Sequence, residues 1–332
     1  MNFAPWQRSV FEAAHGSLAE GRLGHALLLV GPEKMGKGEV AAILAKRLLC
    51  ASPAADGLAC GQCRSCRQFE AGTHGDFSRV GFEPNDKGDK LRSEITVDQI
   101  RRLGQWFALT PQLGGAQVAL IEPAEGMNHA AANALLKTLE EPSPGRFLLL
   151  VCSAPGRLPA TIRSRCQRLE FRLPAKEQAE AWLRSQGHAE ADIGAALEAA
   201  RGHAGLAADW LAQGGLALRR QVRGDLDAVG NGKSGPVEMA QRWLGDEQAA
   251  LRLRFAADLA QDALSRRLGA RPPEKGGLTA PGDFSKLSAW YDALNRVRGQ
   301  LSAPLRHDLL LAGLLREWRT MLLEDRKEGV AR

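Results

Sequence analysis

The sequence lacks long uncharged apolar runs, has one tyrosine and carries no block of like charge. No run approaches the roughly 20 apolar residues that a membrane-spanning helix needs, so we expect no membrane segment. The first residues, with Phe3, Pro5 and Trp6, lack the basic start and apolar stretch of a secretory signal, which favours a cytoplasmic protein. The net charge of +6 is spread over 332 residues. It permits an acidic partner such as nucleic acid without indicating one.

Cysteines are few, but four of the six crowd into residues 50–66. A cytoplasmic protein keeps its thiols reduced, so a tight cluster indicates a metal site rather than disulfides. Four thiolates with two-residue gaps suit tetrahedral zinc, and a complete shell makes the metal structural. The alternative is four free surface thiols. The predicted Zn²⁺ ligands are Cys50, Cys60, Cys63 and Cys66, and His74 is surplus to them.

The first half of the chain alternates short apolar runs with helical patterns, which is typical of a parallel sheet flanked by helices. Helices are expected after residue 38, from the capping box at Thr96, and from Asn128 to Glu141. The expected buried strands are Ala26–Val30, Val118–Ile121, Phe147–Val151 and Gln167–Leu173.

A glycine-rich loop, Gly31-Pro-Glu-Lys-Met-Gly36-Lys37-Gly38, follows the first strand and opens a helix. In this setting backbone N–H groups and the helix N-terminus hold phosphate oxygens, and Lys37 would reach the outer phosphates. The motif then requires Ser or Thr as a magnesium ligand, and here Gly38 stands in that place. Gly31, Gly36 and Lys37 therefore leave nucleotide binding open, whereas hydrolysis is not expected.

The strand Val118–Ile121 ends in Glu122-Pro123, where an active ATPase needs a metal-binding Asp followed by a Glu. Pro123 cannot act as a base, and Glu122 is a longer carboxylate that either binds metal or merely ends the strand. Both the loop and this strand end therefore lack residues that magnesium-dependent ATP hydrolysis requires.

Three regions differ in character. Residues 1–173 form the predicted α/β domain, with the zinc module at 50–66 as an insertion. Residues 174–213 indicate a small helical domain and residues 214–332 a larger one, with helical patterns at 247–268, 284–301 and 305–325. A proline- and glycine-rich loop is expected at 271–283.

Several stretches resemble the clamp-loader branch of the AAA+ proteins, mainly over residues 1–213. They are His25-Ala-Leu-Leu-Leu, the four cysteines, Ala71-Gly-Thr-His74, Ala132-Asn133-Ala-Leu-Leu-Lys137-Thr-Leu-Glu140-Glu141-Pro142, Leu158-Pro159 and Ser164-Arg165-Cys166. The resemblance implies a RecA-like AAA+ domain, a helical lid at 174–213 and an all-α collar at 214–332.

The resemblance further implies that Arg165 is an arginine finger, which acts on ATP held by a neighbouring subunit. Partners would be homologous subunits, including motor ATPases, in a hetero-oligomeric ring that places a sliding clamp on primer-template DNA. Active members carry a Gly-x-x-Arg arginine where this chain has Gly202-His-Ala-Gly205. This third departure agrees with the first two and predicts a non-hydrolysing subunit.

Other interpretations remain open. The chain could be an active motor-type ATPase, which predicts turnover that is lost on Lys37→Ala. The zinc loop could bind nucleic acid. However, it offers only two cations and one nearby aromatic ring for stacking, namely Arg64, Arg67 and Phe69. Arg165 could form only a surface salt bridge. The exposed end of the 130–139 helix, Lys137 to Glu141, could line either a subunit surface or a DNA-facing surface.

Overall fold

The computed structural model describes residues 3–85, 87–269, 278–301, 303 and 305–330. Its internal contacts divide the chain into two compact units, Met1–Ala208 and Asp209–Arg332. The finer division of the first unit at residue 173 stays a prediction. Of the loop predicted at 271–283, residues 271–277 lie outside the described part of the chain.

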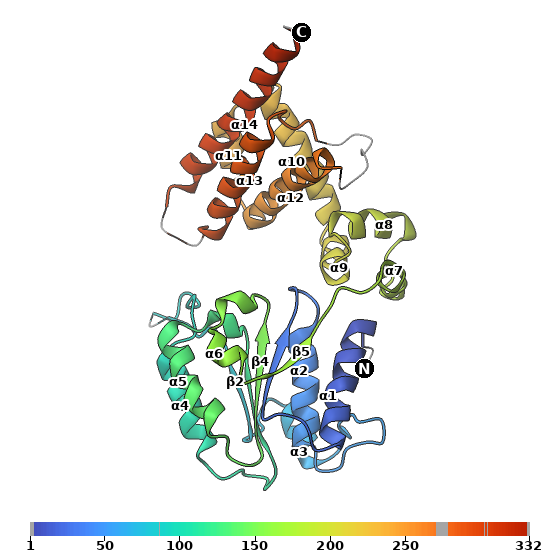
Figure 1. Cartoon of the computed structure of the whole chain (residues 1–332), viewed down its shortest axis with the longest axis vertical. Helices are drawn as coiled ribbons and strands as arrows, with labels where there is room; N and C mark the ends of the chain where they lie inside the picture. Colours follow the sequence, from blue (N-terminus) through green and yellow to red (C-terminus); the bar gives the residue numbers. More distant parts are fainter. Residues whose placement is uncertain (1–2, 86, 270–277, 302, 304, 331–332) are drawn as a thin grey trace. The chain divides into compact units, whose positions relative to one another are not determined.

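A five-stranded parallel sheet forms the centre of the first unit (Figure 1). The strand order is β2-β3-β4-β1-β5, so the first strand lies inside the sheet, with β4 and β5 on its two sides. Residues Leu28 and Leu150 are register partners in the middle of the sheet. The strands are β1 (Ala26–Val30), β2 (Phe77–Val80), β3 (Gln117–Ile121), β4 (Arg146–Cys152) and β5 (Gln167–Glu170).

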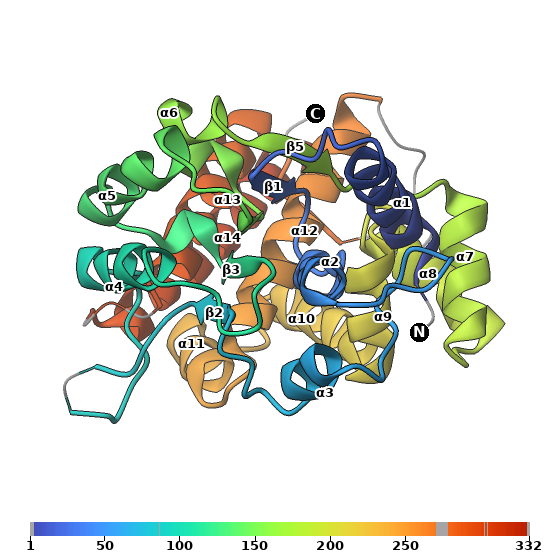
Figure 2. The ribbon, with the colours of Figure 1, turned by 90° about the horizontal axis from the view of Figure 1, so that it is seen from below.

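Helices cover both faces of this sheet, as Figures 1 and 2 show from two directions. On one face lie α1 (Pro5–Ala19), α2 (Lys37–Leu49) and α3 (Arg64–Glu70). On the other lie α4 (Val97–Phe107) and α5 (His129–Glu140). The predicted α/β class with a parallel sheet is confirmed.

Local sequence signals fix where the helices on the second face begin. Thr96 and Gln99 form the expected capping box of α4, and Asn128 caps α5 by accepting a hydrogen bond from Ala131 N at 2.9 Å. The apolar sides of both helices pack on the sheet in one core with strand residues such as Leu150. This packing holds the ends of α4 and α5 in fixed positions against the sheet.

Short helices complete the chain up to residue 212. They are η1 (Ala124–Gly126), η2 (Pro155–Arg157), α6 (Ala160–Arg163), α7 (Lys176–Ser185), α8 (Glu190–Ala199) and α9 (Ala204–Ala212). Trp6 of α1 and Trp182 of α7 meet edge to face, with 4.9 Å between ring centroids, which ties this helical region to the α/β part of the first unit.

The second unit consists of helices packed around three fully buried tryptophans, Trp243, Trp290 and Trp318. Each indole N–H has a partner; that of Trp318, for example, donates to Leu226 O at 3.1 Å. The three predicted helical patterns are confirmed. The helices are α10 (Gly215–Gly230), α11 (Pro236–Leu244), α12 (Ala249–Arg267), α13 (Phe284–Gly299) and α14 (His307–Val330).

The last strand is shorter than predicted. β5 ends at Glu170 rather than at Leu173. Among the described residues, its one neighbour in the sheet is β1, which ends at Val30, and the Val30 carbonyl accepts a final hydrogen bond from Phe171 N at 2.7 Å. Beyond that point, the part of the chain that the structure describes offers no strand to pair with, and Leu173 is exposed.

Candidate functional site

The glycine-rich loop lies at the carboxyl end of β1 and leads directly into α2, as predicted. Gly36 precedes α2 with a φ of 75°, a left-handed conformation that glycine adopts without strain. Gly31 allows a close approach of another chain segment, because a Cβ there would lie 2.5 Å from Phe171 O. Both glycines therefore serve the backbone path of a phosphate loop.

Lys37 is buried and turned toward its own loop. Its Nζ donates to Pro32 O at 2.5 Å. Burial lowers the pKa of this ammonium group, and the carboxylate of Glu125 is the main opposing influence. Glu125 is itself held by Ser153 N and Ala154 N, at 2.8 and 3.1 Å from Oε1. The Lys37 ammonium group, which would bind a phosphate, is thus already close to the carboxylate of Glu125.

At residue 38, where the motif requires a hydroxyl, another side chain lies against the backbone. A Cβ on Gly38 would overlap Oε1 of Glu122 and would lie 2.7 Å from Oε2. Arg79 holds this carboxylate by donating from Nη2 to Oε2 at 2.6 Å. The space that a magnesium-ligating Ser or Thr would need is therefore filled by Glu122, which is one methylene longer than the usual Asp.

Two other segments cover the loop. From α1, the Trp6 indole donates to Met35 O at 3.1 Å, and Gln7 Nε2 donates to the same carbonyl at 3.4 Å. From α9, Gly205 packs so closely that a Cβ there would overlap the carbonyl oxygen of Lys34 and lie 2.8 Å from its carbon. An arginine in the helical region could not approach the loop through this position.

Gly205→Ala is expected to lower the free energy of unfolding by about 1–3 kcal/mol, because the new methyl group meets backbone rather than a yielding side chain. Gly194→Ala in α8 is the matched control, since nothing lies within 4 Å of its Cβ position. It should gain about 0.5–1 kcal/mol from helix propensity. Urea unfolding of both variants measures the difference, and equal midpoints would contradict the close packing.

The four clustered cysteines come together as predicted. Their sulfurs all lie within 4.8 Å of one another. Measured separations include 3.6 Å between Cys50 and Cys60 and 4.0 Å between Cys60 and Cys66. A disulfide would need about 2.05 Å, whereas zinc–sulfur bonds of about 2.3 Å in a tetrahedron place sulfurs about 3.8 Å apart. The donor set therefore fits one tetrahedral zinc ion.

Backbone N–H groups also point at these sulfurs, as is suitable for thiolates. Cys60 N donates to the sulfur of Cys50 at 3.3 Å, and Cys66 N donates to that of Cys63 at 3.4 Å. Such bonds satisfy the sulfur lone pairs that a metal leaves unused.

Surrounding contacts fasten the cysteine module to the domain. Ser65 Oγ donates to Leu49 O at 2.6 Å and contacts His74 Nε2 at 2.8 Å. His74 Nδ1 accepts from Asp76 N at 3.0 Å, so both ring nitrogens are engaged outside the cluster. Lys46 of α2 forms an ion pair with Glu70 of α3. The module thus supports the C-terminal end of the helix that the loop opens.

Arg165 lies between α6 and β5, at the amino-terminal edge of the sheet, whereas the loop follows the carboxyl end of β1. Its guanidinium donates to Thr161 O at 3.0 Å and pairs with Glu140 Oε1 at 2.8 Å. The side chain is 37% exposed. The surface salt bridge that the sequence offered as an alternative role for Arg165 is therefore present in the single chain. The guanidinium group nevertheless remains accessible at the surface.

The sequence did not reveal every residue at the loop. Glu125, Gln7 and Arg79 were missed, because each approaches the loop from another element. A carboxylate three residues after Glu122 was the one available signal for Glu125.

The sheet order, the loop after the first strand and the flanking helices define an AAA+-type phosphate-loop domain with an altered loop. Comparison with known sequences makes this specific. A profile of the family described as DNA polymerase III, delta subunit matches residues 6–175. The chain belongs to the family of DNA polymerase III subunit delta′.

Individual relatives agree. The delta′ subunit of Escherichia coli K12 is 37% identical over 328 residues, which is 95% of each chain. That of Pseudomonas aeruginosa is 44% identical over 179 residues, 54% of this chain and 52% of the relative. The tau subunit of E. coli K12 is 35% identical over 169 residues, 51% of this chain and 24% of that protein. Among the described residues, no helix is long and apolar enough to cross a membrane.

Proposed function

We propose that the chain is a non-hydrolysing, δ′-like subunit of the clamp loader of bacterial DNA polymerase III. It helps to load the sliding clamp onto primed DNA during replication. Its partners are motor ATPase subunits and δ in a hetero-oligomeric ring, with the clamp and primer-template DNA reached through the complex. It works in the cytoplasm as part of a DNA polymerase holoenzyme and has no ATPase activity of its own.

One observation carries the non-hydrolysing part of this proposal: the carboxylate of Glu122 fills the space beside Gly38. Phosphoryl transfer needs magnesium held by the loop hydroxyl and a carboxylate, together with a group that orients the nucleophile. The hydroxyl is absent, Glu122 is bound to Arg79, and Pro123 follows it. The same loop is covered by α1 and α9, so we expect little or no nucleotide binding.

Arg165 is the group through which the chain would act on ATP. A guanidinium is planar and always charged, and it stabilises the negative charge of a transferring phosphoryl group. Its position at the amino-terminal edge of the sheet supports action on a nucleotide held by a neighbouring subunit, since its own loop follows the opposite edge.

Zn²⁺ at Cys50, Cys60, Cys63 and Cys66 would have a structural role. Four protein sulfurs complete the coordination shell and leave no position for substrate or water. The helical lid at 174–213 and the collar at 214–332 remain our assignment for the rest of the chain, with the collar supplying constant contacts within the ring.

Co-purification from native cells tests the assignment. An affinity-tagged chain expressed at its natural level is expected to recover the motor subunits and δ in fixed proportion. Recovery of the chain alone, without these subunits, would contradict membership of the assembly.

The alternative of an active motor-type ATPase is tested on the isolated chain. Gly38→Thr restores the missing hydroxyl, yet we expect no ATP turnover, because Glu122 occupies the metal site and Pro123 cannot orient water. Phosphate release is the measurement, with a motor subunit assayed in parallel as the positive control. Turnover by the natural chain that disappears with Lys37→Ala would favour the alternative.

A further inference from the structure

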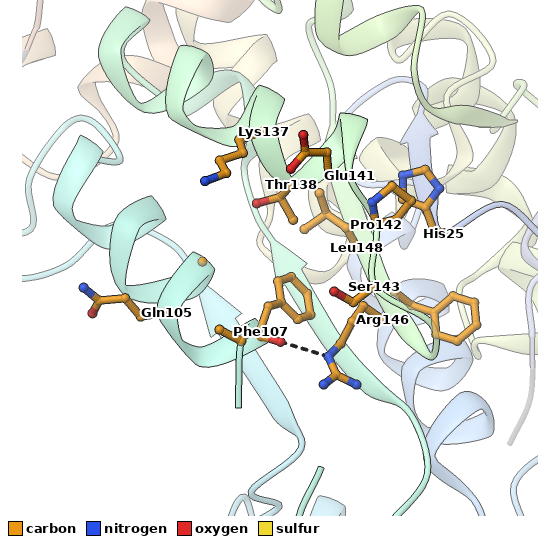
Figure 3. A pocket seen from close by; sticks show the side chains of 13 residues that line it. His25, Gln105, Phe107, Lys137, Thr138, Glu141, Pro142, Ser143, Arg146 and Leu148 are labelled. Carbon is orange, nitrogen blue, oxygen red and sulfur yellow. Dashed lines mark hydrogen bonds between the residues drawn. The ribbon is translucent and has the colours of Figure 1, made fainter. Parts of the chain in front are cut away.

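A pocket of about 410 Å³ opens at the amino-terminal edge of the sheet, away from the phosphate loop (Figure 3). Its walls are the C-terminal ends of α4 and α5, and its floor includes the beginning of β4. The volume lies within the range of sites that bind ligands. Neither the altered loop nor the arginine finger accounts for it.

The pocket is preformed, because two of its lining residues fix the helix ends that surround it. His25 Nε2 donates to Leu139 O, at the end of α5, at 3.1 Å. Arg146 donates from Nε to Phe107 O at 3.0 Å, at the end of α4 (Figure 3). Its Nη2 donates to Leu109 O, just beyond that end, at 2.8 Å. Side-chain N–H donors that bind the last carbonyl groups of a helix stabilise its C-terminal end. The walls are therefore held without a ligand, and binding costs little ordering.

The interior is apolar and the rim is charged. Phe107 and Leu148 are 7% and 2% exposed and present apolar surface to the cavity. In Figure 3, Lys137 extends toward α4, whereas Glu141 lies on the side of His25. In the part of the chain that the structure describes, no hydrogen bond or ion pair engages the Lys137 ammonium group. This lysine belongs to the 132–142 motif that the sequence singled out.

We infer that this pocket is a docking site for a segment of a partner protein that inserts one large apolar side chain and sets an acidic residue against Lys137. The apolar floor favours the inserted side chain. The α4 side of the mouth offers an uncommitted ammonium group, so a carboxylate there gains a charged partner at the edge of an apolar site.

A nucleic acid fits the same features less well. Phosphate binding uses several cations along a path together with exposed rings for stacking. Here the N–H groups of Arg146 are directed to carbonyl oxygens, so, among the described residues that line the pocket, Lys137 carries the one ammonium or guanidinium group left to meet a phosphate. The charge at the mouth therefore favours a single carboxylate over a phosphate chain. This site goes beyond the proposed function, which gives a role to Arg165 at the same edge of the sheet but none to this pocket.

The test selects phage-displayed random twelve-residue peptides on the full-length chain and compares three variants. Lys137→Glu reverses the charge at the mouth, and Ser143→Trp fills the opening from an exposed loop position. Lys233→Glu makes the same charge change at an exposed position in the second unit and is the matched control. Circular dichroism melts establish that each variant is folded.

We expect the enriched peptides to combine a large apolar residue with a neighbouring Asp or Glu. A synthetic peptide of the leading sequence should bind the natural chain and Lys233→Glu equally by fluorescence anisotropy. It should bind Lys137→Glu at least about tenfold more weakly and should not bind Ser143→Trp. Failure to enrich peptides, a basic consensus, or binding that neither pocket variant alters would overturn the inference. So would Lys137-dependent binding of a twelve-nucleotide single strand in place of any peptide.

Discussion

Arg165→Ala is expected to slow ATP hydrolysis at the neighbouring motor site about 10³-fold in the assembled clamp loader. The guanidinium supplies positive charge to the transferring phosphoryl group, and in GTPases such a group is worth about 10³–10⁵ in rate. Assembly should persist, because Arg165 is partly exposed and its contacts, to Thr161 O and Glu140, are at the surface of its own chain. Single-turnover hydrolysis in the presence of primed DNA and clamp is the measurement.

Two variants control this experiment. Arg163→Ala removes an exposed arginine only two residues away and should leave hydrolysis unchanged. Arg165→Lys should remain slow, since an ammonium group cannot reproduce the planar, two-pronged geometry of a guanidinium. Equal rates for Arg165→Ala and the natural chain would remove the finger role and leave the Glu140 salt bridge as the purpose of the residue.

Cys60→Ser is expected to reduce bound zinc from one ion per chain to well under one and to unfold the module at residues 50–66. Structural zinc contributes about 10–16 kcal/mol of apparent binding free energy in zinc-finger peptides. Zinc loss should also loosen the end of α2, because Lys46 and Glu70 pair across α2 and α3. Elemental analysis gives the zinc content, and hydrogen exchange reports on α3 and the end of α2.

Cys166→Ser is the matched control, because Cys166 lies outside the four-sulfur cluster and should leave zinc content unchanged. Natural chain purified without chelator and found to hold well under one zinc would contradict the metal assignment. If Cys60→Ser lost its zinc but hydrogen exchange in α3 stayed unchanged, zinc binding would be confirmed and its structural role would be contradicted.

Much of the site was predictable where the determinant is local in sequence. The loop at 31–38 follows an apolar strand, and its glycines are required by backbone geometry that a short segment sets by itself. The cysteine cluster is equally local, because two-residue gaps bring successive sulfurs to one ion. The starts of α5 and α4 were predictable because Asn128 and Thr96 are capping residues whose partners lie three residues further along the chain.

The parts that were not predictable depend on residues distant in sequence. Nothing near Gly205 indicates that it would pack on Lys34, since that contact needs the helical region folded back on the loop. The Trp6 contact with Met35 O likewise depends on α1, which reaches the loop only in the folded domain. β2 was missed because only one of its four residues is buried and they carry no clear alternation.

The pocket between α4 and α5 illustrates the same limit. Lys137 and Glu141 were expected to be exposed, and they are. Their neighbours across the cavity, His25 and Arg146, come from the beginnings of two strands that lie side by side only in the folded sheet. A sequence motif can therefore mark a surface without revealing its shape.

The most direct test of the central claim compares two variants of this chain in one reconstituted complex. The claim is that the chain acts on a nucleotide it does not hold. Lys37→Met removes the cation of its own loop, and Arg165→Ala removes the group offered to the neighbour. We expect full ATP hydrolysis and clamp loading with Lys37→Met, and loss of hydrolysis at one site with Arg165→Ala. The reverse result, loss with Lys37→Met and full activity with Arg165→Ala, would contradict it.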